Sequence, residues 1–255
     1  MRTATASRVQ PDITDLFACS PTGVEDAFAG RGFDASSSLA SSSARLRDRA
    51  FDRGIETLTD TEVLELYIAR ATPRGASAYA AALVARFGDL HAVLAADVAA
   101  LSMVVERELA LDLRLLFDLT RRSLEIPLRA REVLSSTTAV IAYLRFTMAS
   151  RPRESVRVLW LDKRNRLIAD EAIGEGTVDH APVYPREVAR RALETSAASC
   201  VLCHNHPSES TSPSNADVQI TKQIIDCLKV FGIPVHDHFI VAGETVVSMK
   251  SLGLI

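Results

Sequence analysis

The chain has 255 residues, of which 47% are hydrophobic and 24% are charged. This composition is ordinary for a globular protein and excludes collagen-like, coiled-coil and wholly disordered classes. The formal net charge is only −3, which argues against binding of nucleic acid by the surface as a whole.

Cysteine content and hydrophobicity indicate the compartment. The four cysteines are too few for a disulfide scaffold. No apolar run approaches the roughly 20 residues that span a bilayer, and the first residues lack the hydrophobic region of a signal peptide. We therefore expect a cytoplasmic protein that makes no contact with a membrane.

The first 44 residues have the composition of a tail. Residues 35–43 are almost entirely Ser and Ala, and Gly and Pro interrupt the sequence before them. Such a segment buries too little apolar surface to offset the entropy lost on ordering. We predict a disordered tail over 1–44.

Helix signals follow one another over residues 45–122. Thr59 and Glu62 have the spacing of a capping box before an apolar run. Gly88 is a C-terminal cap signal after an alanine-rich segment, and Asp97 can cap a short helix. The predicted helices begin after Thr59 and cover 76–87, 90–94, 97–101 and 109–124. This pattern predicts a small all-α helical bundle, followed by a linker over 123–132.

From residue 133 the pattern changes to alternating helices and strands. Pro185 is typical of a helix start, and the turn at 162–165 joins two β-like segments into a hairpin. The predicted helices are 137–148, 186–196 and 216–230, and the predicted strands are 155–161, 167–173, 198–203, 235–241 and 246–249. This order predicts a compact α/β domain over 133–255.

The run from Cys203 to Pro207 reads C-H-N-H-P and lies between an apolar strand and a predicted helix. Residues two apart in an extended chain share a face, so His204 and His206 can point at one spot. Asp217 in the first turn of the next helix could add a carboxylate. Two imidazoles and one carboxylate suit a tetrahedral zinc with a fourth position left for water. A His-x-His pair also occurs by chance, and the alternative is two surface histidines without a ligand.

The spacing of this run resembles the JAMM (MPN+, JAB) metalloprotease signature: H-x-H-P, then a serine eight residues after the second histidine, then an aspartate three residues later. The wider sequence, with G-T at 176–177, P-R-E-V at 185–188, H-N-H-P-S at 204–208 and D-H at 237–238, is similar to bacterial RadC-like proteins. The resemblance covers about residues 45–255. It implies an α-β-α fold of the MPN/JAB type, related to cytidine deaminases.

The resemblance also implies roles for single residues. His204, His206 and Asp217 would hold one zinc ion per chain. Ser214 would help to stabilise the oxyanion, a role open to any correctly directed donor. Glu154 would be the catalytic glutamate that takes a proton from the attacking water and delivers it to the leaving amine.

Three other glutamates remain alternatives to Glu154 by distance along the chain: Glu171, Glu175 and Glu187. The last of these lies in the P-R-E-V run at a helix start, where an acid is favoured by the helix dipole alone.

Two departures from the family pattern bear on function. Glu209 stands where the family usually has the glycine of H-N-H-P-S-G; glycine there would permit a positive φ or a close approach of substrate. In the helical half, Glu106-Arg107-Glu108 occupies the place of a Gly-containing hairpin whose backbone amides contact DNA phosphate. Acids there disfavour the binding of a DNA phosphate. We therefore expect the helical half to be a structural or protein-interaction bundle.

Two further patterns suggest metals or cofactors. Cys200 to His204 fits C-x-x-C-H, the pattern for covalent haem attachment, but positions 200 and 203 of a strand point to opposite faces, so both cannot reach one haem. His236-Asp237-His238 could suggest a second metal, whereas the family pattern, which keeps only Asp237-His238, favours a structural role or contact with a ligand.

The leading hypothesis is thus a zinc-dependent hydrolase acting on a peptide or isopeptide bond of a peptide or protein substrate, with a zinc-activated water attacking the amide carbonyl. One alternative is an accessory protein of DNA repair or processing that binds nucleic acid. Another is an MPN scaffold that keeps the fold without turnover.

Overall fold

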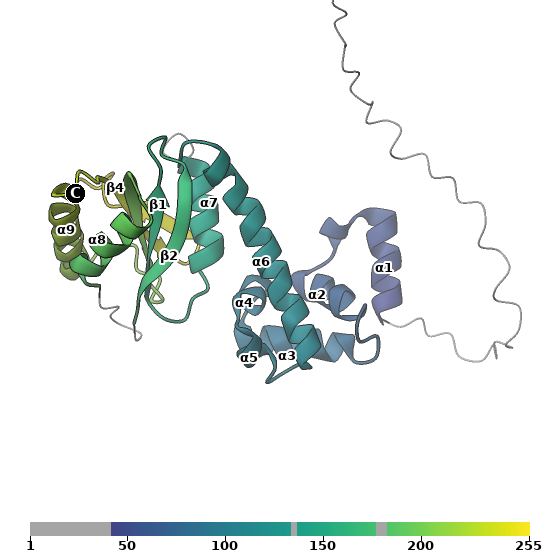
Figure 1. Cartoon of the computed structure of the whole chain (residues 1–255). Coiled ribbons are helices and arrows are strands. Elements are labelled where there is room, and N and C mark those ends of the chain that lie inside the picture. Colours follow the sequence, from purple (N-terminus) through teal and green to yellow (C-terminus); the bar gives the residue numbers. More distant parts are fainter. Residues whose placement is uncertain (1–41, 134–136, 177–182) are drawn as a thin grey trace, which may run out of the picture. The chain divides into compact units, whose positions relative to one another are not determined.

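The computed structural model describes residues 42–133, 137–176 and 183–255. Most of the predicted tail lies outside the described residues. The helices of the first part are α1 (Ser42–Arg53), α2 (Asp60–Ile68), α3 (Ala76–Phe87), α4 (Leu90–Ala95), α5 (Val98–Leu101) and α6 (Arg107–Ala130), with a short 3-10 turn at Ile55–Thr57 (Figure 1).

Local hydrogen bonds set the starts of these helices. Thr59 and Glu62 form the predicted capping box of α2, and the Asp97 side chain accepts a hydrogen bond at the start of α5. Gly88 ends α3 with a φ of 105°, a value that only glycine adopts without strain. The capping signals in the sequence therefore predicted these boundaries correctly.

The helical part has its own apolar core, in which Ile68, Ala80, Leu83 and Leu113 are fully buried. Two boundaries were predicted wrongly. Helix α1 begins at Ser42, inside the predicted tail. Helix α6 continues to Ala130, through most of the segment predicted as a linker, because Leu128 is buried in the core of the next part of the chain.

The second part contains one sheet. Its strands lie in the order β2-β1-β3-β4-β5, and neighbouring strands are antiparallel except for the parallel pair β3 and β4. The elements are α7 (Thr137–Met148), β1 (Ser155–Leu161), β2 (Leu167–Glu175), α8 (Pro185–Glu194), β3 (Ser199–Asn205), α9 (Asn215–Lys229), β4 (Val235–Ala242) and β5 (Thr245–Ser248).

Helices cover both faces of this sheet. One face packs against α7 through a core that includes Cys203 and Leu144, and the other packs against α8 and α9 through a core that includes Cys200 and Ile224. Figure 1 shows α7 on one side of the sheet and α8 and α9 on the other. The fold is therefore the expected α/β type with three layers. The two cysteines lie on opposite faces, as predicted, which rules out a shared haem.

No helix in the described part of the chain is long and apolar enough to cross a membrane.

Candidate metal centre

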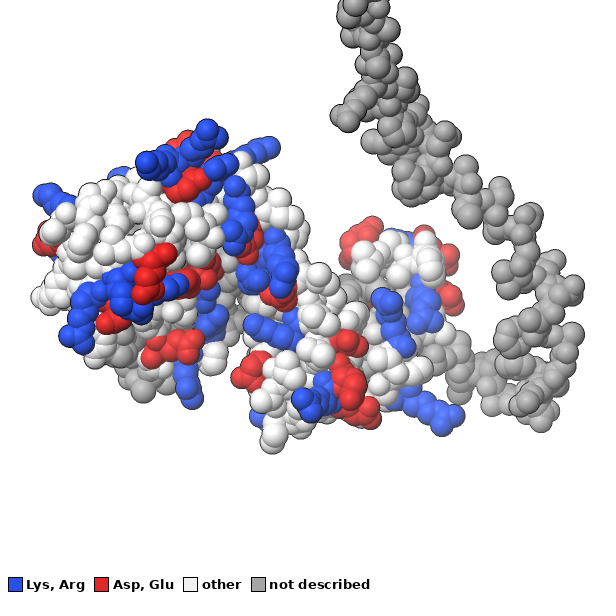
Figure 2. Space-filling model, viewed as in Figure 1, with Lys and Arg blue, Asp and Glu red and all other residues white. Residues whose placement is uncertain are grey.

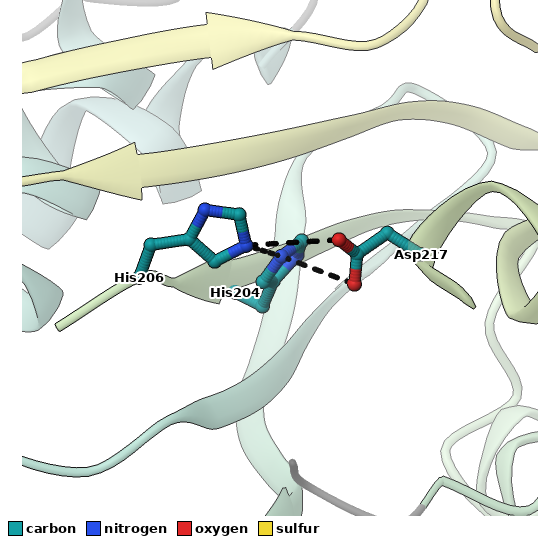
Figure 3. Close-up of side chains that lie close together, drawn as sticks. All are labelled: His204, His206 and Asp217. Carbon is teal, nitrogen blue, oxygen red and sulfur yellow. Dashed lines mark hydrogen bonds and ion pairs between the residues drawn. The ribbon is translucent and has the colours of Figure 1, made fainter. Parts of the chain in front are cut away.

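Strand β3 and helix α9 bring together the two histidines and the aspartate of the sequence motif. His204 lies near the end of β3 and is fully buried, and His206 follows directly after the strand. Asp217 occupies the third position of α9, where it forms a capping box with Ser214. Figure 3 shows the three side chains pointing toward one another. We call them the His–His–Asp cluster.

The distances within the cluster are those of a set of ligands. His204 Nε2 lies 2.8 Å from His206 Nε2 and 3.4 Å from Asp217 Oδ1. His206 Nε2 lies 3.6 Å from Asp217 Oδ2. Ligand atoms about 2.0–2.1 Å from a tetrahedral zinc are about 3.3 Å apart. Two separations are close to this value, and that between the two histidines is somewhat shorter.

A chain of buried hydrogen bonds determines which nitrogen of His204 carries the proton. The carbonyl oxygen of Asp217 only accepts, so the Thr221 hydroxyl donates to it at 2.5 Å. His238 Nδ1, 2.7 Å from that hydroxyl, then donates to it. His238 Nε2 is left as an acceptor for His204 Nδ1 at 2.8 Å. This assignment leaves His204 Nε2 with a bare electron pair directed into the cluster.

His206 is oriented in the same way by a backbone carbonyl. Its Nδ1 lies 2.6 Å from the carbonyl oxygen of Ser210 and must donate to it, so Nε2 is the bare nitrogen of the neutral ring. Two electron pairs 2.8 Å apart facing a carboxylate form a donor set for a cation. Hydrogen bonds of this kind to the outer nitrogen are usual for histidines that bind metals.

The protonation states also suit a metal. Burial lowers the pKa of His204 to about 4, so its ring is neutral at pH 7, and burial lowers the pKa of His238 as well. Burial opposes ionisation of Asp217, but its interactions with His206 and His204 and the hydrogen bonds from Ser214 outweigh it, and the pKa of Asp217 falls well below its usual value. The neighbouring carboxylate of Asp217 in turn raises the pKa of His206.

The cluster therefore fits zinc by the nature of its donors: two neutral imidazoles and one carboxylate. Within the described residues, it is the one group of three or more His, Cys, Asp or Glu side chains that converges closely enough to hold an ion. The predicted ligands thus lie together.

The cluster lines a cavity of about 680 Å³. The wall includes apolar side chains from β1, β3 and α9, namely Val156, Leu202, Ile220 and Ile224. Glu154 also lines this cavity, and its charge contributes to the raised pKa of His206. Apart from Asp217, Glu154 is the only carboxylate among the described residues of the wall.

The three alternative glutamates lie elsewhere. Glu171 accepts hydrogen bonds from Trp160 and Arg191, and Glu187 is an exposed partner of Arg190. Glu175 is exposed at the end of β2. None of the three is part of the cavity wall. Of the four candidate glutamates, Glu154 alone lines the cavity that contains the cluster.

Ser214 is engaged in the helix cap. Its hydroxyl donates to Asp217 Oδ2 at 2.7 Å and accepts from the Asp217 N–H at 3.1 Å. In this state the Ser214 proton is directed at a ligand of the cluster. Stabilisation of an oxyanion by Ser214 stays a prediction from the family resemblance.

Glu209 adopts the conformation for which the family uses glycine. Its φ is 58°, and its side chain lies along Gly243, where an added Cβ would lie 3.3 Å from the Glu209 carboxyl carbon. The loop thus keeps a left-handed residue with a side chain attached, and Glu209 is not part of the cavity wall.

Two residues around the site were not identified from the sequence. Thr221 completes the hydrogen-bond chain described above, and the buried Asn205 bonds to the backbone near Glu154. The position of Asn205 between two candidate ligands was a usable signal, because a polar residue in a buried strand needs partners. Of the H-D-H run, His238 contacts a candidate ligand as expected, whereas His236 bonds to Asn165.

A comparison with protein families supports this fold. The model of the RadC-like JAB domain matches residues 134–254, which include all five strands and the His–His–Asp cluster. Residues 134–254 therefore belong to the RadC-like JAB domain family.

Proposed function

We propose that this protein is a zinc-dependent amide hydrolase that cleaves a peptide or isopeptide bond. The observation that carries the proposal is one cavity that contains both the His–His–Asp cluster, with its bare imidazole nitrogens, and a separate carboxylate, Glu154. Membership of the JAB superfamily, which includes hydrolases, supports it.

His204, His206 and Asp217 would hold the ion. A zinc ion bound there supplies a Lewis acid that lowers the pKa of water toward 7 and polarises a carbonyl group. The hydrogen bonds that the two rings donate, to His238 and to the Ser210 carbonyl oxygen, orient them, so that the metal-binding nitrogens need little rearrangement.

Glu154 would perform the proton transfers. A carboxylate beside the cluster can accept a proton from the attacking water and deliver it to the departing amine nitrogen. The apolar wall formed by Val156, Leu202 and Ile220 would exclude bulk water from these steps, which strengthens electrostatic interactions within the site.

The charges of the cavity favour an amide over a phosphodiester. The described part of its wall contains no Lys or Arg, while it contains two carboxylates. Phosphoryl transfer needs cationic groups around the phosphate oxygens.

The helical part also carries acids where a phosphate would bind. Glu106 is the cap of α6 and Glu108 lies in its first turn, which opposes the binding of phosphate at that helix end. On the face seen in Figure 2, Lys and Arg are interspersed with Asp and Glu.

The test is hydrolysis of a broad peptide and isopeptide library by protein loaded with zinc. The controls are the same protein after removal of metal, and Glu154→Gln loaded with zinc. We expect cleavage products from the loaded protein alone. Zinc-loaded protein that binds the metal but cleaves nothing across the library would contradict the proposal and favour an MPN scaffold. Binding of DNA that weakens steeply as salt is raised would favour the nucleic-acid alternative.

A further inference from the structure

A buried polar side chain near the candidate base is that of Asn205, which is 1% exposed. It lies at the end of β3, between the two histidines of the cluster. Its Nδ2 donates to the carbonyl oxygens of Arg151 and Arg153, at 3.2 and 3.1 Å. Its Oδ1 accepts from the Ser155 N–H at 3.0 Å. These three bonds end on the segment that contains Glu154, and we call them the Asn205 clamp.

The clamp requires a carboxamide. Two carbonyl oxygens need two N–H donors, and one backbone N–H needs an acceptor. Only the side chains of Asn and Gln provide both from one group, and Gln is longer by a methylene. Asp would keep the acceptor but present a carboxylate to two carbonyl oxygens. These contacts also fix which end of the amide of Asn205 is nitrogen.

The clamp takes the place of a backbone hydrogen bond at the end of the β1–β3 pairing. The antiparallel pairing of β1 with β3 ends at Val156 and His204, so the next pair would be Ser155 with Asn205. The side chain of Asn205 takes over the Ser155 N–H there. On the other side, the Gly176 N–H donates to the carbonyl oxygen of Glu154 at 3.0 Å. The backbone of Glu154 is therefore held on both sides, although it lies outside the strand.

We propose that Asn205 is a positioning residue that sets the distance between Glu154 and the metal ligands. The inference rests on the proposed function, because it assigns the purpose of the clamp to the acid–base role of Glu154. One residue flanked by both histidines holds the segment of the base, so ligands and base move as one unit. Displacements of about 1 Å in such a unit can cost about a hundredfold in rate.

A double-mutant cycle tests this role. We would measure kcat, KM, zinc content and the thermal midpoint for the wild-type protein, Asn205→Ala, Glu154→Gln and the double variant. For Asn205→Ala we expect about one zinc per chain, KM within about twofold, and kcat lower by about 10- to 100-fold. The double variant should match Glu154→Gln within about twofold, because Asn205 acts through Glu154.

A matched control comes from the other end of the same strand. Ser199 is also buried in β3, and its hydroxyl donates to Asn165 away from the cavity. Ser199→Ala should leave kcat within about twofold. If Asn205→Ala loses zinc, or if it lowers the rate by the same factor with and without Glu154, Asn205 supports the ligands or the fold in general, and the proposal is wrong.

Hydrogen exchange reports on the clamp independently of activity and without a variant. The Ser155 amide of the wild-type protein should be protected like the amides within β1, although its N–H donates to the Asn205 side chain and not to the backbone of a neighbouring strand. Rapid exchange of the Ser155 amide would overturn the clamp. A zinc-loaded wild-type protein that cleaves no amide but protects Ser155 would instead overturn the proposed function.

Should Asn205→Ala fail to fold, Asn205→Asp takes its place in the double-mutant cycle, because Asp keeps the acceptor for the Ser155 N–H.

Discussion

The helical part and the JAB domain use their polar side chains differently. In the helical part, the hydrogen bonds of side chains are mostly local. Asp89 and Asp97 each accept a hydrogen bond from a backbone N–H three residues later, in the first turn of the helix that follows. Asp118 pairs with Arg121 and Arg122 on the same helix. Around the cavity of the JAB domain, His204 bonds to His238, 34 residues away, and Asn205 bonds to a residue 50 positions away.

This difference distinguishes polar side chains that stabilise a single helix from polar side chains that several segments hold in place. A local cap or ion pair stabilises the helix to which it belongs and needs no further partner. A buried polar group with a distant partner must be satisfied by a precise arrangement of several segments. Such groups are concentrated where the JAB domain directs nitrogen and oxygen atoms at one point. The comparison therefore favours the JAB domain as the place of the proposed chemistry.

The largest effect should follow from the loss of the acid–base carboxylate. Glu154→Gln should lower kcat for amide hydrolysis by about 10³-fold, because the amide cannot accept a proton, and should leave zinc content unchanged. Glu175→Gln is the matched control, since Glu175 pairs with Ser155 across the hairpin but lies outside the cavity wall. Equal losses in the two variants would contradict the role of Glu154.

Removal of packing in the helical part should affect stability but not the metal. Leu113 is fully buried in α6, and Leu113→Ala should cost about 2–5 kcal/mol in the free energy of unfolding. Leu119 on the same helix is 63% exposed, so Leu119→Ala should cost far less. Denaturant unfolding measures both. A folded Leu113→Ala that no longer binds zinc would break the division between the two parts.

The hydrogen bond from His204 to His238 should tune metal affinity. His238→Phe removes the acceptor for His204 Nδ1, and zinc affinity should fall by about 10- to 100-fold, as measured by competition with a chelator. His236→Phe, two residues earlier in β4 and bonded to Asn165, should bind zinc like the wild type. An unchanged affinity in His238→Phe would refute the proton assignment made above.

The cap of α2 should contribute a smaller amount. Thr59 accepts from the Glu62 N–H, and Thr59→Ala should lower the free energy of unfolding by about 1 kcal/mol. Thr59→Ser keeps the hydroxyl and should restore most of this loss. Hydrolysis and zinc content should not change in either variant.

The same cap predicts a weak dependence on acid. The ion pair with Arg49 and the hydrogen bond from the Thr59 N–H lower the pKa of Glu62 from 4.5 to about 2. Because folding favours the ionised carboxylate, this stabilisation is complete above pH 4.5 and is lost as the pH falls toward 2. The wild type should therefore exceed Glu62→Gln in thermal midpoint at pH 6 and approach it near pH 2. A gap that does not shrink on acidification would argue against the ion pair.

The sequence predicted those elements whose signals are local. Thr59, Gly88 and Pro185 marked helix boundaries through caps and fixed dihedral angles, and the strand β1 was predicted to the residue. The end of α6 was missed because its last turn is stabilised by burial of Leu128 against the next part of the chain, which no local pattern reveals.

The candidate site was likewise predictable only where its signals are local in the sequence. The spacing from His204 to Asp217 encodes a strand, a loop and a helix start, so the cluster could be inferred. Thr221 and Asn205 could not, because their roles depend on partners brought close by the sheet. For the same reason, sequence alone left four glutamates as candidates, while the cavity wall favours one.

The central claim is that His204, His206 and Asp217 hold a zinc ion. The most direct test is the metal content, by mass spectrometry, of the purified protein and of His206→Ala after both are supplied with zinc and freed of excess. His206 is the best position to change, because Asp217 also takes part in the capping box of α9. We expect about one zinc per chain in the wild type and its loss in the variant. No bound metal in either protein, or equal zinc in both, would contradict it.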